Sequence, residues 1–465
     1  MSTFSGLNTA RTALFAAQRG LDVSGQNIAN VNTAGYSRQR VELQSVGGNS
    51  VPAVHSVSNG IGGGVDSDTV IRIRDAFLEA RAQTEHATTA QLTVRNETLG
   101  QIEQAFREPG ETGIQSMLAD VWAGWSDVAN NPKELGARGQ ALESMETLAA
   151  GFRATSATLD EQRQQTVDSV STLVKDVNKT LTSIAGLNAD IRLATQSGLP
   201  ANELMDKRDA LVLALSGQTG ATSTAKDFGV VDVSLGGTTL VSGGNALQVA
   251  YDPAVPTAIV TAPGGSKLSV GGTAGGLVDA LGTLASYQTQ LDARAGELAT
   301  AFNTAHQAGF DQTGEPGGAL LGAPGGGPVT AATLSVLVTD PTRLAAASTK
   351  PIVLDDGTRL VSSDGSNADA FYQLSLAPSG VDASYRKMIV QLGVEAAVAS
   401  RNVEVQSVIG NQVDSARESV AGVSLDEEMT NMLSFQHAYS AAGRMITAID
   451  EALDTLINRT GRVGL

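Results

Sequence analysis

The sequence predicts an α+β multidomain protein. Its two chain ends form a terminal α-helical coiled coil and a helical rod, and the middle of the chain is a β-rich central insert. Three patterns predict this fold: heptad-spaced apolar residues at both termini, helical periodicity over residues 76–215, and alternating apolar and polar residues from about residue 216. A length of 465 residues allows about three domains.

Each terminus carries an apolar residue at every seventh position. Near the N-terminus these residues are Leu7, Leu14, Leu21 and Ile28. Near the C-terminus two such rows run together: one comprises Met432, Tyr439, Ile446 and Leu453, and the other Phe435, Ala442, Ile449 and Leu456. Such rows are typical of coiled coils, although a single row also fits an amphipathic helix lying on a core. Because one occurs at each end, we expect an assembly interface in which the ends pair with each other or with other copies of the chain.

These patterns divide the chain into three regions. The terminal coiled-coil segments are residues 1–35 and 425–465. The mainly helical rod domain, which includes a β-hairpin region at 36–75, comprises residues 36–215, 277–310 and 380–424. The β-rich outer domain comprises residues 216–276 and 311–379.

Helix breakers divide the helical part. Asn130-Asn131-Pro132 and Gly198-Leu199-Pro200 each end a helix, because the residue before a proline is pushed out of the helical conformation. Trp122 and Trp125 lie three positions apart, on one face of a helix, and we expect them to anchor a core rather than to bind a ligand.

Two hairpins are expected in the central insert. Residues 231–235 and 238–241 alternate in polarity around Gly236-Gly237, and a two-glycine turn between such runs is a strong hairpin signal. A second pair of strands is expected around residues 259–260 and 268–270. Helix then returns from Leu277 to about residue 308.

The composition excludes several classes of chemistry. The chain has no cysteine, which removes disulfides, thiolate nucleophiles and thiolate-bound metals. Its four histidines (His55, His86, His306 and His437) are too scattered for an imidazole metal cluster. Neither a phosphate-binding loop nor a nucleophile elbow occurs. We therefore expect no catalytic, metal or cofactor site, and no enzymatic activity.

Charge and hydropathy limit the partners. A net charge of −17 disfavours nucleic acid, which needs a basic face to replace its counterions. No apolar run approaches the ~20 residues that cross a bilayer, and the N-terminus lacks the pattern of a cleaved secretory signal. We expect no membrane insertion, and either a cytoplasmic protein or one exported without such a signal.

Three charged segments have structural interpretations. Ser424 stands three residues before Glu427 in the run Asp426-Glu427-Glu428, which is the spacing of a capping box at the start of a helix. The run Asp206-Lys207-Arg208-Asp209 is expected to form an ion-pair network that fixes helix packing. The segment Asp311–Gly314 lacks the ligand pattern of a calcium loop and is expected to be a turn.

Several of these segments resemble one family. Asn27-Ile28-Ala29-Asn30, with Asn32-Thr33-Ala34-Gly35-Tyr36 after it, resembles the N-terminal signature of bacterial flagellar axial proteins. The continuation Ser37-Arg38-Gln39 and the C-terminal stretch 422–457 resemble the hook-associated members of that family. The residues that carry the resemblance are Asn27, Asn30, Asn32, Gly35, Tyr36, Ser37, Arg38, Asp206, Arg208, Asp209, Asp426, Glu427, Glu428 and Gln436.

The resemblance implies a structural component of the flagellum at the junction between hook and filament. It implies assembly with copies of the same chain, with hook protein and with a second junction protein, and binding of an export chaperone to the C-terminal helix. It also implies export without a cleaved signal to an extracellular position. Another axial component, such as a rod, hook or second junction protein, is the main alternative. A secreted enzyme or an adhesin carried on the central insert is a further one.

Overall fold

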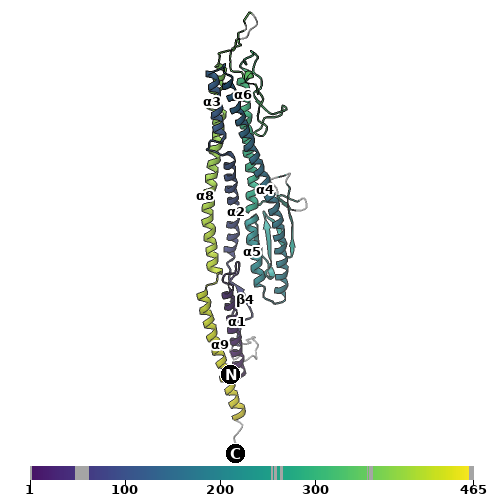
Figure 1. Cartoon of the computed structure of the whole chain (residues 1–465). Coiled ribbons are helices and arrows are strands. Elements are labelled where there is room, and N and C mark those ends of the chain that lie inside the picture. The colour runs from purple at the N-terminus through teal and green to yellow at the C-terminus, as the bar shows by residue number, and fades with distance from the viewer. Residues whose placement is uncertain are drawn as a thin grey trace, which may run out of the picture. The chain divides into compact units, whose positions relative to one another are not determined.

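The chain folds into two compact units. Figure 1 shows its helices and strands. The computed structural model describes residues 3–47, 62–252, 255, 259–261, 265–352, 354–355 and 360–459. Unit 1 combines residues 1–87, 177–248 and 408–465, and unit 2 combines residues 88–176 and 249–407. Long helices dominate both units and small antiparallel sheets occupy the middle of the chain, which confirms the predicted α+β class.

Helices form most of unit 1. The first and last long helices of the chain, α1 (Thr3–Ala29) and α9 (Leu425–Asp454), pack against each other (Figure 1). One complete helix and parts of three longer helices accompany them, namely α5 (Asn202–Thr219), the start of α2 (Ala76–Phe106), the end of α4 (Leu135–Gln196) and the end of α8 (Val381–Ala421). A π-helical turn, Thr455–Arg459, follows α9.

The largest sheet also belongs to unit 1. Its four antiparallel strands lie in chain order: β5 (Thr222–Ala225), β6 (Val231–Leu235), β7 (Thr238–Ser242) and β8 (Asn245–Ala246). The β6–β7 turn is Gly236-Gly237 with both φ angles positive, which confirms the first predicted hairpin. Buried Asn188 of α4 donates to the carbonyls of Val231 (2.7 Å) and Gly243 (3.0 Å), which ties this sheet to the helix.

Short strands follow α1 in the region expected to contain a hairpin. Strand β1 (Gln39–Val41) pairs with β4 (Val70–Arg72), and β2 (Gln44–Val46) pairs with β3 (Gly64–Asp66), all antiparallel. A 3₁₀ turn, Asp227–Gly229, precedes β6. Residues 48–61, which include His55, lie outside the described part of the chain.

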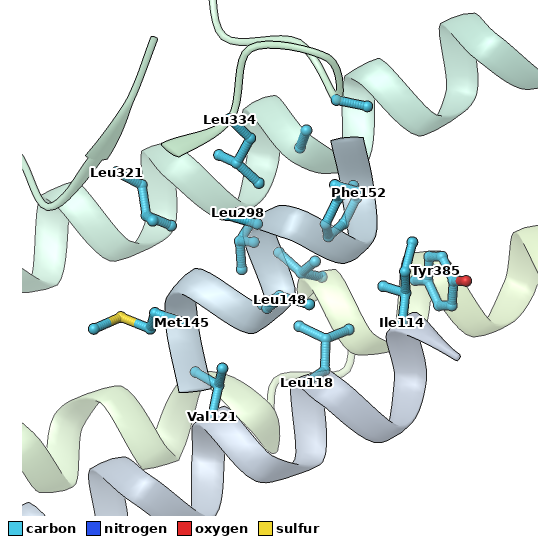
Figure 2. Close-up of a cluster of buried hydrophobic side chains, with 14 of the residues drawn as sticks. Ile114, Leu118, Val121, Met145, Leu148, Phe152, Leu298, Leu321, Leu334 and Tyr385 are labelled. Carbon is cyan, nitrogen blue, oxygen red and sulfur yellow. The ribbon is translucent and has the colours of Figure 1, made fainter. Parts of the chain in front are cut away.

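Unit 2 is a helical bundle with a continuous apolar core. It contains α3 (Ile114–Asn130), α6 (Gly272–Gln307) and α7 (Ser366–Ser375), together with the remaining parts of α2, α4 and α8. Figure 2 shows core side chains from α3, α4, α6 and α8 pointing toward one another. Trp125 is fully buried and stacks on Phe371 with ring centroids 3.6 Å apart, and Trp122 joins the same cluster, so the predicted core role of both tryptophans is confirmed.

Polar side chains fix the irregular loops of unit 2. The Asp311 carboxylate accepts from the Thr313 and Glu315 N–H groups, so the predicted turn is confirmed. Buried His306 uses both ring nitrogens: one lies 2.8 Å from the Gly318 carbonyl, and the other accepts the Ala345 N–H at 2.9 Å. Because the accepting nitrogen has no proton, burial and this bond favour the neutral ring, and burial lowers the pKa of His306 below its ordinary value.

Several expected boundaries need correction. Residues 366–375, expected within a β-rich region, form α7, while α5 extends to Thr219 and α6 begins at Gly272. Strand β10 (Ile259–Thr261) pairs with β9 (Val249–Tyr251), which was not expected. The second expected hairpin is present only in part: Val260 bridges Lys267, and the Leu268 N–H donates to the Ile259 carbonyl at 2.8 Å. Only β11 (Leu321–Gly322) and β12 (Ser335–Val336) pair within the described part of 311–379.

The outer insert is divided between the two units. Residues 216–248 belong to unit 1, whereas 249–276 and 311–379 belong to unit 2. The physical reason is burial: apolar side chains of 320–346 enter the unit 2 core, while the sheet β5–β8 is held on α4 in unit 1. The three-region division and the outer position of the insert in an assembly remain predictions. No described helix is long and apolar enough to cross a bilayer.

Candidate assembly interface

The terminal helices pair in an antiparallel arrangement. A Cβ atom placed on Gly20 would lie 2.6 Å from the ring of Phe435, and one placed on Gly6 would lie 3.4 Å from Ile449 Cδ1. From the first of these contacts to the second, the residue number decreases along α1 and increases along α9, so the two helices run antiparallel. Glycine at position 20 leaves space for the Phe435 ring, so a small residue and an aromatic residue interlock at this point.

The seam buries small residues more completely than the predicted leucines. Ala10, Ala17 and Ser24, three places after the leucine row, are buried in α1, and Ala442 is buried in α9. The predicted residues that are half-buried are Leu7, Leu14, Leu21, Ile28, Met432, Phe435, Ile446, Ile449 and Leu453. Within one copy, the pair therefore covers these predicted side chains only in part.

Apolar side chains remain at the surface of both helices. Tyr439 is 41% exposed and Leu456, in the π-helical turn after α9, is 55% exposed, so the described part of the chain leaves both predicted interface residues uncovered. The same holds for residues that were not predicted, namely Phe15, Leu425, Met429, Leu433 and Ile457. A surface of this composition is typical of a protein–protein interface.

The signature segment after α1 folds around one buried asparagine. The Asn27 side chain donates to the Gln39 carbonyl (2.9 Å) and accepts from the Gln39 N–H (3.0 Å). The Tyr36 hydroxyl also donates to the Asn27 side chain (2.8 Å). This closes residues 27–39 into a loop, in which Gly35 adopts a positive φ of 79° that favours glycine.

Two further signature residues connect this loop to α5 and α9. The Ser37 hydroxyl donates to Asp206 of α5 at 2.8 Å. Arg38 donates to Glu428 (2.7 Å) and Glu427 (2.5 Å) in the first turn of α9. The capping box is confirmed in its first half, since the Ser424 side chain accepts from the Glu427 N–H, but the Glu427 carboxylate turns to Arg38 instead of completing the box.

The predicted ion-pair network is present on α5. Asp209 receives hydrogen bonds from three guanidinium groups: Arg72 at 2.8 Å, Arg208 at 2.7 Å, and Arg74. Arg72 also pairs with Asp206 at 2.8 Å. Burial alone would raise the pKa of the Asp209 carboxyl, but the guanidinium groups of Arg208, Arg74 and Arg72 hold it below its ordinary value.

The network extends to residues that sequence reasoning missed. Glu79 of α2 pairs with Arg74 (2.6 Å) and with Arg417 of α8 (3.0 Å). Asp414 contacts Arg417 (3.1 Å) and His86 (3.0 Å). Asp414 and Arg417 are one helical turn apart, but the pairs of Glu79 with Arg417 and of His86 with Asp414 form only where α2 and α8 meet, so no local pattern indicates them.

The remaining signature residues make local contacts or lie at the surface. The Asn30 side chain donates back to the Gln26 carbonyl. Asn32, Asp426 and Gln436 are exposed. Burial, with Asp206 and Glu428 nearby, raises the pKa of Tyr36 to about 12, so its hydroxyl stays protonated as the donor to Asn27.

The hydrogen bonds and ion pairs of this region hold helices in position relative to one another. Residues 27–39 fasten α1, α5, the end of α8 and the start of α9 to one another. A groove of about 870 Å³ beside the loop is lined by Arg74, Glu79, Asp414 and Arg417, which are engaged in ion pairs of the fold. Among the described residues no group of three or more acidic or histidine side chains could hold a metal ion.

Three segments of the chain match known protein families. Residues 7–36 match a family of flagella basal body rod proteins, and residues 416–459 match the C-terminal family of flagellar basal body rod FlgEFG proteins. Residues 99–321 match the helical domain of flagellar hook-associated protein FlgK. Together these matches define a flagellar axial protein.

Relatives over the whole chain identify the family. Flagellar hook-associated protein 1 of Bacillus subtilis is 32% identical and covers 99% of both chains. The protein of the same name from Escherichia coli is 25% identical, over 97% of this chain and 99% of its own. The structure of the flagellar hook junction protein FlgK from Burkholderia pseudomallei has the same fold, with a TM-score of 0.62 at 18% identity over 75% of this chain and all of its own. The chain belongs to the flagellar hook-associated protein 1 family, and it is a structural component of the flagellar hook–filament junction.

Proposed function

We propose that this chain forms a ring or helical layer at the distal end of the hook, on which the second junction protein and then the filament assemble. In this layer the α1–α9 pairs of successive copies line an inner tube, and the interface comprises the heptad residues of both helices. The chain adapts one tube to the next, and it does so by geometry rather than by catalysis.

The observation that carries this proposal is the apolar surface left on the α1–α9 pair. Phe15 and Leu433 are each more than half exposed although they belong to the paired helices, and Leu456 in the π-helical turn after α9 is exposed to the same extent. Burying such side chains contributes about 1.5–3 kcal/mol each, which gives a favourable term for lateral packing between copies. The joint around Arg38 supports the same role, because it fixes the first turn of α9 to the segment that follows α1.

The proposed partners follow from this arrangement. They are further copies of the chain, hook protein on one side and the second junction protein on the other. Before assembly, an export chaperone covers the exposed apolar residues of α9. We propose that the chain is exported without a cleaved signal and acts outside the cell, with neither nucleic acid nor membrane as a partner.

Gene deletion followed by complementation tests the role. Cells without the chain should form hooks that lack filaments and should lose flagellin to the medium, and the natural chain should restore filaments. Filaments anchored normally on hooks in the deletion strain would refute the proposal.

A single substitution tests the interface. Leu453→Asp places a carboxylate in the half-buried seam, so the folded chain should be secreted without restoring filaments. Ala448→Asp, at an exposed position of the same helix, is the matched control and should restore them. Tryptophan fluorescence reports whether unit 2 stays folded in each variant, since Trp122 and Trp125 both lie there.

A further inference from the structure

Helix α8 has two apolar faces where it belongs to unit 2. One face is buried in the core through Tyr385, Met388, Leu392 and Ala399. The other face exposes four valines, each about half or more accessible to solvent: Val390 (60%), Val394 (54%), Val398 (48%) and Val405 (55%). At about 100° per residue these valines fall within an arc of about 80°, opposite the buried face. They form a continuous stripe, named here the valine face.

Positive charge accompanies the valine face. Lys387 and Arg401 are exposed on the same arc, and Arg386 lies at its edge. These three positive charges compare with a single exposed carboxylate near the arc, that of Glu404. Unit 2 as a whole has 15 Lys and Arg against 27 Asp and Glu, a net charge of −12. The valine face is therefore a locally basic surface on an acidic body, and the rest of that body offers the opposite charge.

A complementary surface lies on α4 of the same unit. Thr147, Ala150, Ala154 and Ala157 are exposed and follow one another at helical spacing, which makes a shallow stripe of small side chains. Exposed carboxylates lie at both ends of this stripe along the helix: Glu143 precedes it, and Glu161 and Asp168 follow it. These residues are named here the alanine face.

We propose that the valine face of one copy packs on the alanine face of a second copy, with Lys387 and Arg401 opposite the carboxylates. This inference rests on the proposed function, since it names the contact that joins neighbouring copies. Small residues on one helix let the branched valines of the other approach closely, and opposite charges at the rim set the register.

The dimensions of the two faces agree. Lys387 and Arg401 are about 21 Å apart along α8, and Glu143 and Glu161 are about 27 Å apart along α4, at 1.5 Å per residue. The long lysine and arginine side chains span this difference. Because two different surfaces meet, the contact is heterologous and repeats from copy to copy, as a ring or helical layer requires.

Site-directed crosslinking tests the contact directly, and the cysteine-free sequence gives it a clean background. Two tagged copies, one with Val398→Cys and one with Ala154→Cys, are supplied together to cells lacking the natural chain, and assembled flagella are oxidised. A disulfide needs Cα atoms within about 7 Å, so we expect about tenfold more mixed dimer than with Ala119→Cys, an exposed position on α3. Equal crosslinking to both, no mixed dimer in flagella that contain both copies, or a crosslink to a different protein would overturn the proposal.

Charge reversal provides a second test that does not depend on oxidation. Glu143→Lys with Glu161→Lys should reduce filament number about tenfold or more, as should Lys387→Glu with Arg401→Glu, and all four changes in one chain should restore filaments. All six side chains of the crosslinking and reversal variants on α4 and α8 are exposed, and tryptophan fluorescence verifies that unit 2 is folded. If the natural chain restores filaments and each charge-reversed pair does so equally well, this contact is wrong while the junction role stands. If the deletion strain itself carries filaments, the junction role is wrong.

Discussion

Replacing Asp209 by asparagine removes the shared acceptor of three arginines while keeping the size of the side chain. Arg72 would keep Asp206, and Arg74 would keep Glu79. Arg208 would lose its carboxylate partner, and of its described hydrogen bonds only the one to the Gly229 carbonyl would remain. Breaking a buried ion pair by removing one partner costs about 3–5 kcal/mol. Because two of the three cations retain a carboxylate, we expect Asp209→Asn to lower the free energy of unfolding of unit 1 by about 3 kcal/mol.

The assay follows the two units separately in the full chain. Tryptophan fluorescence reports unit 2, and hydrogen exchange of residues 202–219 reports α5 in unit 1. In urea, exchange at α5 should become faster at concentrations that leave the fluorescence transition unchanged. Asp160→Asn is the control: Asp160 also pairs with an arginine, but its side chain is 70% exposed, so its loss should cost less than about 1 kcal/mol.

The effect should also depend on pH, with a fixed sign. The folded-state pKa of Asp209 is lowered, so its contribution is fully present above the unfolded value of about 3.9 and is lost as pH falls through the folded value. The difference between the natural chain and Asp209→Asn should therefore shrink below about pH 4. A difference smaller than that of the control at neutral pH, or one that grows in acid, would refute the assignment of this network.

Three further predictions concern other positions. Gly20→Ala should destabilise the α1–α9 pair by about 1–3 kcal/mol, because its methyl group meets the Phe435 ring. Gly25→Ala has open space around the new methyl group and should stabilise α1 by up to about 1 kcal/mol. Thermal unfolding followed by circular dichroism measures both, and the opposite order of stability would contradict this packing. Ser424→Ala removes the N-cap of α9 and should cost about 1 kcal/mol, seen as about fivefold faster hydrogen exchange in its first turn, and unchanged exchange would count against the cap. Because burial lowers the folded-state pKa of His306, unit 2 should lose stability as pH falls below about 6.5. In His306→Gln the Tm measured by tryptophan fluorescence should depend less on pH. An equally steep pH dependence in the variant would show that a group other than His306 causes it.

Patterns with a short repeat were predictable from sequence. The heptad rows located α1 and α9, and the two proline breaks are confirmed by α3 ending at Asn130 and α4 ending at Gln196. The spacing of Ser424 to Glu427 predicted a cap because capping is a contact within one turn. These features are local, so a single segment contains the whole signal.

Contacts between distant segments could not be read in the same way. The run of charges around Asp209 indicated an ion-pair network, but its partners Arg72 and Arg74 are more than 130 positions away and depend on the topology. Helix α7 was missed because it is only ten residues long, too short for a clear helical repeat, and its Phe371 packs on Trp125, which is distant in sequence. The division of the insert followed from burial of residues 320–346 in the unit 2 core and from attachment of the sheet β5–β8 to α4 in unit 1, which no periodicity reveals.

The pairing of α1 with α9 has a consequence for the life of the chain before assembly. The two helices are separated by about 400 positions, so α1 emerges early in synthesis and waits for its partner until nearly the last segment has been made. A prematurely terminated chain can fold much of unit 2 but has no α9 to complete the seam. If the α1–α9 surface lines the inner tube as proposed, only chains translated through both helices can present that surface.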